Sequence, residues 1–235
     1  MLRFISFFLA LVCLAIPVYA EQPNGCPDYS PPVIVINQLS VNPQLNDTFD
    51  LEGLRQFALD SQKDFSSTQH ETPVGLTAAS LKLDTHFEIN VRVSPDDPLV
   101  CAQIKSFQMD YGFDDTMIYL ARELPNGSCS YHTVLEHEQR HVAADENLVR
   151  STTPFLKEQL RGALARIGVI RASSPQVAET QIHDMISGYM KELGKNLSVV
   201  RQKHQSFIDT PQEYDRLSHS CNGTLADLIR ASRRR

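Results

Sequence analysis

Two histidines and a glutamate lie within five residues of one another, in the segment His137-Glu138-Gln139-Arg140-His141. Residues four apart lie one turn above each other on the same face of an α-helix, so both imidazoles can bind one metal ion. This H-E-x-x-H spacing is typical of zinc metallopeptidases. It predicts His137 and His141 as Zn²⁺ ligands and Glu138 as the general base that takes a proton from a zinc-bound water.

The alternative is an ordinary amphipathic helix whose exposed polar face carries these residues, with Glu136 and Arg140 as an i,i+4 ion pair. Apolar residues around the motif favour a partly buried helix instead: Val134, Leu135, Val142 and Leu148. We therefore predict an enzyme, a zinc metallopeptidase that acts on a peptide or protein substrate. The second hypothesis is a non-catalytic exported binding module with a vestigial or structural metal site.

A catalytic zinc ion normally has three protein ligands and a water, and the motif supplies only two. Asp145 lies on the same helix face, but roughly 12 Å of helical rise beyond His137, too far to complete the site. No glycine follows the motif, so the extended metzincin pattern is absent. The third ligand must come from elsewhere, either from an acid such as Glu179 or Glu192 or from the closing segment Tyr214-Asp215 with His219.

The N-terminus predicts export. A basic residue, Arg3, precedes an apolar stretch that ends at Val18-Tyr19-Ala20, which is the layout of a signal peptide covering residues 1–20. No other apolar run approaches the ~20 residues of a membrane span, so we expect a secreted or periplasmic product without stable membrane insertion. Residues 21–235 then form a single domain with a short basic C-terminal tail, Arg233-Arg234-Arg235.

Four cysteines remain after signal-peptide removal: Cys26, Cys101, Cys129 and Cys221. An even number in an exported protein predicts two disulfides, and the chain lacks the close C-x-x-C pairs of a four-cysteine zinc site. We predict that the shorter loop closes between Cys101 and Cys129 and that Cys26 pairs with Cys221. The net charge of -6 argues against a broad nucleic-acid surface. Nothing in the sequence predicts an oligomeric state or a pro-segment boundary.

The first half of the chain has the pattern of strands and the second half that of helices. Strands are expected at 33–36, 86–93, 100–109 and 116–120, the last two separated by a turn at Asp110-Tyr111-Gly112. Helices are expected at 51–65, from Thr133 to 149, from Pro154 to Gly168, and from Ser174-Pro175 onward. Apolar residues at 182, 186, 189, 193, 197, 200 and 207 predict one buried stripe on that last helix. The order predicts an α+β domain.

The sequence resembles a bacterial family of predicted secreted zinc-dependent proteases, otherwise filed as a domain of unknown function, over roughly Gly75 to Gly223. The resemblance rests on Val100-Cys101, on the segment from Met117 to Leu120, on Leu135 to His141, and on Tyr214-Asp215 with a nearby histidine. It implies a zincin-like single exported domain with His137 and His141 as ligands and Glu138 as base. It also implies His219 as third ligand and Asp215 as a residue that orients a ligand, although here Ser220 follows His219 where the family has glycine.

Overall fold

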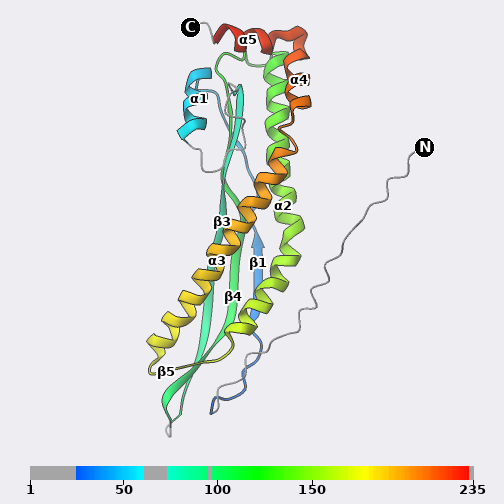
Figure 1. Cartoon of the computed structure of the whole chain (residues 1–235). Helices are drawn as coiled ribbons and strands as arrows, with labels where there is room; N and C mark the ends of the chain where they lie inside the picture. The colour runs from blue at the N-terminus through cyan, green and yellow to red at the C-terminus, as the bar shows by residue number, and fades with distance from the viewer. Residues whose placement is uncertain (1–24, 61–72, 95–96, 233–235) are drawn as a thin grey trace, which may run out of the picture.

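The longest elements are two strands in the first half of the chain and two helices in the second (Figure 1). The computed structural model describes residues 25–60, 73–94 and 97–232. The predicted signal peptide and the arginine tail lie outside these residues. The predicted α+β class, with strands first and helices after them in a single domain, is confirmed.

The sheet is built around one strand. β4 (Asp97–Leu120) pairs antiparallel with β3 (Gly75–Ser94) along nearly its whole length. Its other neighbours are β1 (Val33–Gln38) and β2 (Gln44–Asn46), both parallel to it, and β5 (Ile170–Ala172), which is antiparallel.

The turn predicted at Asp110-Tyr111-Gly112 is wrong, because these residues lie inside β4. Phe107, Met109, Tyr111 and Phe113 alternate along the strand and are all buried. This period of two continues through the glycine, and the burial of four large side chains on one face outweighs a local turn signal.

α2 (Cys129–Ile167) is one helix of 39 residues. It starts four residues before the predicted Thr133, where the Ser128 hydroxyl accepts a hydrogen bond from the Tyr131 N–H. It ends before Gly168, as predicted, where the glycine takes a positive φ of 61° and its N–H donates to the Leu164 carbonyl. The prediction that Pro154 begins a new helix is wrong, since Pro154 lies inside α2. Leu148, Leu156 and Leu160 are buried on either side of it, so packing against the sheet keeps the helix continuous.

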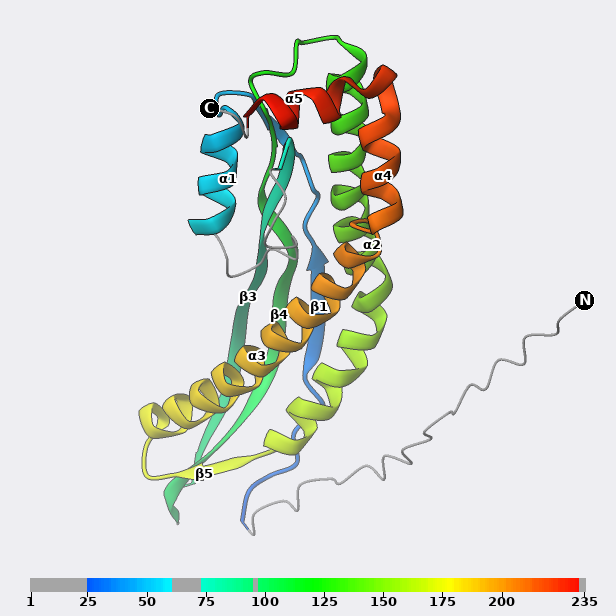
Figure 2. The ribbon, with the colours of Figure 1, turned by 45° about the horizontal axis from the view of Figure 1, so that its top comes forward.

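α3 (Pro175–Ser206) begins as predicted, with Ser174 as N-cap and Pro175 in the first turn. Its apolar stripe is buried at Ile182, Ile186, Leu193 and Leu197 and partly buried at Tyr189. The predicted continuation of the stripe is wrong, because Val200 and Phe207 are 38% and 69% exposed. Figure 2 shows α3 crossing the long strands obliquely and reaching α2 near the C-terminal end of α3. At that end, polar residues of α3 contact α2 through hydrogen bonds in place of the apolar stripe.

The remaining helices gather at one end of the long strands (Figures 1 and 2). They are α1 (Leu51–Asp60), α4 (Pro211–His219), the 3-10 turn η1 (Ser220–Gly223) and α5 (Thr224–Ser232). α1 confirms the described part of the predicted helix 51–65, and residues 61–65 lie outside the described ranges. A small core beneath these helices includes Leu54, Ile118, Val134, Leu217 and Leu225, while a larger core lies between the sheet and helices α2 and α3.

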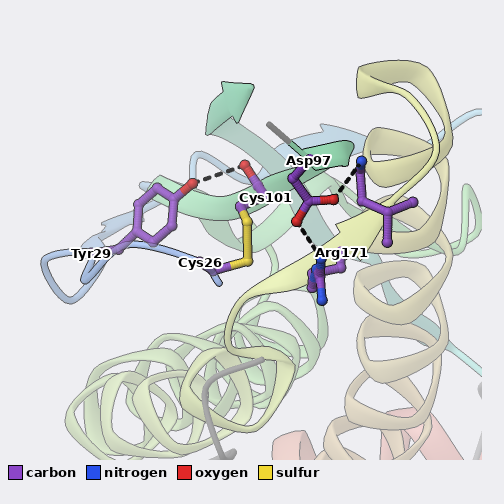
Figure 3. The surroundings of a disulfide bond; sticks show 6 residues. Cys26, Tyr29, Asp97, Cys101 and Arg171 are labelled. Atoms are coloured by element: carbon purple, nitrogen blue, oxygen red, sulfur yellow. Dashed lines mark hydrogen bonds and ion pairs between the residues drawn. A yellow bond between two sulfur atoms is a disulfide. The ribbon is translucent and has the colours of Figure 1, made fainter. Parts of the chain in front are cut away.

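Two disulfides are present, as predicted, but the predicted pairing is wrong. Cys26 bonds to Cys101 and Cys129 to Cys221. Cys101 lies near the start of β4 and Cys129 follows the end of that strand, so β4 itself separates the two cysteines. Figure 3 shows the Cys26–Cys101 bond, with the Tyr29 hydroxyl donating to the Cys101 carbonyl at 2.8 Å. Two disulfides indicate an oxidising compartment outside the cytoplasm. Among the described residues, no helix has the length and apolarity of a membrane span.

Candidate metal centre

The H-E-x-x-H segment lies on the buried side of α2. His137, Glu138 and His141 are 5%, 4% and 8% exposed. Val134 and Val142, one turn to either side, pack into the small core. Because all three side chains are buried, the motif does not occupy the exposed polar face of an ordinary amphipathic helix.

Three side chains converge at the motif: His137, His141 and Asp209. The two Nε2 atoms are 3.2 Å apart. Asp209 Oδ1 lies 3.3 Å from His137 Nε2 and 3.2 Å from His141 Nε2. The three atoms therefore form a nearly equilateral triangle. In tetrahedral coordination with metal–ligand bonds of about 2.0 Å, any two ligand atoms are roughly 3.3 Å apart, so these three side chains have the spacing to hold a metal ion.

Asp209 lies in the short link between α3 and α4, and its side chain is only 16% exposed. The Asp209 N–H donates to the Gln205 carbonyl, which continues the last turn of α3. Asp209 is not among the ligands predicted from the sequence. The sequence carries a weak signal for this residue, because Thr210-Pro211 is typical of a helix start. It therefore places Asp209 in the link between two helices, though not at the metal centre.

The other predicted ligands do not reach this cluster. The His219 side chain is 78% exposed on α4, and its Nδ1 lies 2.8 Å from the carbonyl oxygen of Asp215. Asp215 is itself 75% exposed. On α3, Glu179 is exposed and Glu192 is paired with Lys195. The structure thus brings His137 and His141 together with Asp209, and not with His219, Asp215, Glu179 or Glu192.

An outer carboxylate holds the first histidine. His137 Nδ1 lies 3.2 Å from Glu213 Oε1, and Arg216 donates to both oxygens of that carboxylate, at 2.8 and 2.9 Å. Arg140 also binds Glu213 and lies 3.0 Å from His137 Nδ1. The Arg140 guanidinium can only donate hydrogen bonds, whereas the Glu213 carboxylate can accept from both Arg140 and the imidazole. We therefore assign both hydrogen bonds to Glu213 as the acceptor. With Nδ1 turned toward Glu213, the other ring nitrogen of His137, Nε2, faces the centre of the cluster.

The second histidine is held by an amide. His141 Nδ1 contacts Gln205 Oε1, while Gln205 Nε2 donates to Asp145 Oδ1 at 2.7 Å and to the His141 carbonyl at 3.2 Å. Asp145 in turn accepts two hydrogen bonds from Arg201, at 2.8 and 2.9 Å. This network fixes the amide so that its oxygen faces the imidazole. His141 Nε2 thereby points toward Asp209, whose Oδ1 lies 3.2 Å away.

The histidines and the carboxylates of the cluster stabilise each other's charged forms. Burial alone would raise the pKa of Asp209, but hydrogen bonds from both histidines hold it well below its usual range. Burial alone would lower the pKa of His141, yet the hydrogen bond and charge of Asp209 and the charge of Glu138 raise it to about 9. The arrangement favours positive charge in the centre, whether carried by a proton or by a metal ion.

Glu138 is not part of the triangle, and its carboxylate contacts β3. Its Oε2 accepts a hydrogen bond from the Thr77 hydroxyl at 2.8 Å. Burial raises the pKa of Glu138, against the charges of His141 and His137 and the hydrogen bond from Thr77, which lower it. A buried carboxylate with a raised pKa is a stronger base than an exposed one and can both accept and release a proton.

Comparison with protein-family models, with curated proteins and with solved structures found no match. The interpretation of the centre therefore depends on its residues and their geometry.

Replacing Asp209 with Asn should lower the affinity for zinc at least about 100-fold. Loss of a residue that only hydrogen-bonds to a metal ligand costs up to about 100-fold, and loss of a ligand should cost at least as much. Asparagine keeps the shape of the side chain but removes the charge. Zinc affinity can be measured by competition with a chromogenic chelator. The matched variant is His219→Ala, which should bind zinc like the wild type. A stronger loss in His219→Ala than in Asp209→Asn would reverse the assignment of the third ligand.

Proposed function

We propose that this chain is an exported zinc metallopeptidase that hydrolyses peptide bonds. The observation that carries the proposal is the triangle of His137 Nε2, His141 Nε2 and Asp209 Oδ1, with buried Glu138 next to it on α2. The family resemblance of the motif and the two disulfides are consistent with it.

A zinc ion held by these three side chains would supply a Lewis acid that lowers the pKa of a water to about 7 and polarises the scissile carbonyl. Glu138 would accept a proton from the attacking water and then deliver it to the amide nitrogen of the leaving peptide. One O–H bond of water and the C–N bond break, and the products are a carboxylic acid and an amine. Glu213 and Gln205 would keep the imidazoles oriented throughout.

The test is metal analysis of the purified protein together with digestion of a peptide mixture. We expect one zinc ion per chain and cleavage that stops after chelation and returns when zinc is added back. His137→Ala should lose both properties. Zinc binding without cleavage of any peptide would instead favour the non-catalytic binding module. Absence of zinc binding would contradict the peptidase and leave the binding module with a vestigial metal site.

A further inference from the structure

Glu138 is adjacent to a proposed ligand in sequence, yet it is not part of the ligand group. Its side chain is instead held by the first residues of β3. Thr77 Oγ1 lies 2.8 Å from Glu138 Oε2 and 3.1 Å from the carbonyl oxygen of the same residue. One hydroxyl thus contacts both the side chain and the backbone of Glu138, which ties its carboxylate to a fixed point on the sheet.

Gly75 provides the space for this arrangement. A Cβ atom added at Gly75 would lie 2.7 Å from Glu138 Oε1 and 2.5 Å from a methyl carbon of Val134. Both distances are shorter than side chains tolerate. Gly75 does not have a positive φ, so its backbone conformation does not require glycine. The missing side chain therefore serves to let the Glu138 carboxylate approach the strand.

Gly75 and Thr77 are two residues apart in a strand, so they lie on the same face of β3, and that face meets α2. One residue leaves room for the carboxylate and the other binds it. Without the Thr77 hydroxyl, a buried carboxylate next to a divalent cation would be drawn to the cation, since charge attraction is strong where water is excluded.

We propose that the start of β3 positions the general base. In this proposal Gly75 leaves room for the Glu138 carboxylate, and the Thr77 hydroxyl binds it. Together they keep Glu138 beside the metal ligands and prevent it from becoming a ligand itself. The proposal rests on the proposed function, because it assigns Thr77 and Gly75 as positioning residues for the same reaction.

The first test compares Thr77→Val, which removes only the hydroxyl, with Thr77→Ser, which retains it. Thr77→Val should lower kcat about 10–100-fold, as is typical when a partner of a catalytic group is lost, with little change in KM. Thr77→Ser should restore kcat to near the wild-type value. The matched control is Thr85→Val, at another half-buried threonine of β3 that pairs with Met109, and it should leave kcat unchanged.

The second readout does not depend on catalysis. The visible absorption spectrum of the Co²⁺-substituted protein reports the number and type of metal ligands. It should change in Thr77→Val, because the released carboxylate can then reach the metal, and should match the wild type in Thr77→Ser and Thr85→Val. Gly75→Ala, which displaces Glu138 by steric contact, should show the same kind of spectral change and covers the case in which Thr77→Val fails to fold.

Unchanged kcat and an unchanged cobalt spectrum in Thr77→Val would overturn the proposal, as would a Thr77→Ser protein as impaired as Thr77→Val. If the wild type binds cobalt but cleaves no peptide, the peptidase function is wrong, and the spectrum alone decides whether β3 holds Glu138 away from the metal. If the wild type binds no cobalt, both proposals fail.

Discussion

Replacing Glu138 with Gln should lower kcat for peptide hydrolysis by about 10²–10⁴-fold, the usual contribution of a general base. The amide has the same shape, and its oxygen can still accept the hydrogen bond from Thr77. It cannot take a proton from water, so binding remains and the chemical step is lost. The measurement is steady-state kinetics on a peptide substrate together with zinc analysis of the same sample.

Zinc content should stay at the wild-type level in Glu138→Gln, because Glu138 lies outside the ligand triangle. The matched control is Glu136→Gln, two residues earlier on the exposed side of α2, which should leave kcat unchanged. A Glu138→Gln protein as active as the wild type would show that another group is the base. Loss of zinc from this variant would show that Glu138 is a ligand.

Replacing Arg201 with Met should destabilise the fold by about 3–5 kcal/mol, the usual effect of removing one member of a buried ion pair. The side chains of Asp145 and Arg201 are only 2% and 12% exposed, and their two hydrogen bonds connect α2 with α3. Without the guanidinium, the Asp145 carboxylate keeps one hydrogen-bond partner within the described part of the chain, the amide of Gln205. Urea denaturation of the zinc-free protein measures the change in unfolding free energy.

The matched control is Arg161→Met, which removes an exposed ion pair with Glu158 and should cost less than about 1 kcal/mol. The double variant Asp145→Leu/Arg201→Met should recover much of the stability, since buried apolar pairs replace buried ion pairs well. It should still bind zinc about 10–100-fold more weakly, because Gln205 loses the anchor that aims its oxygen at His141. Arg201→Met with the stability of Arg161→Met would contradict the structural role of this pair.

Local patterns in the sequence predicted the features that depend on neighbouring residues. The alternation of apolar residues in the strand expected at 86–93, now part of β3, and the spacing of four in the motif both survive folding, because each repeats the geometry of its own element. The caps at Ser174 and Gly168 are equally local, since each satisfies backbone groups within one turn. The turn signal at Gly112 and the break at Pro154 failed because burial of the flanking apolar residues outweighed them.

The sequence by itself determined the pair of histidines, the glutamate between them and the α+β order of the elements. Only the tertiary structure decided what completes the site. Asp209, Gln205 and Glu213 reach α2 because α3 packs obliquely on the sheet and the chain then turns back into α4, and Thr77 reaches Glu138 because β3 lies beside α2. The disulfide partners were decided in the same way. Such contacts join residues far apart in the chain, and no local spacing encodes them, since they depend on how the long helices pack against the sheet.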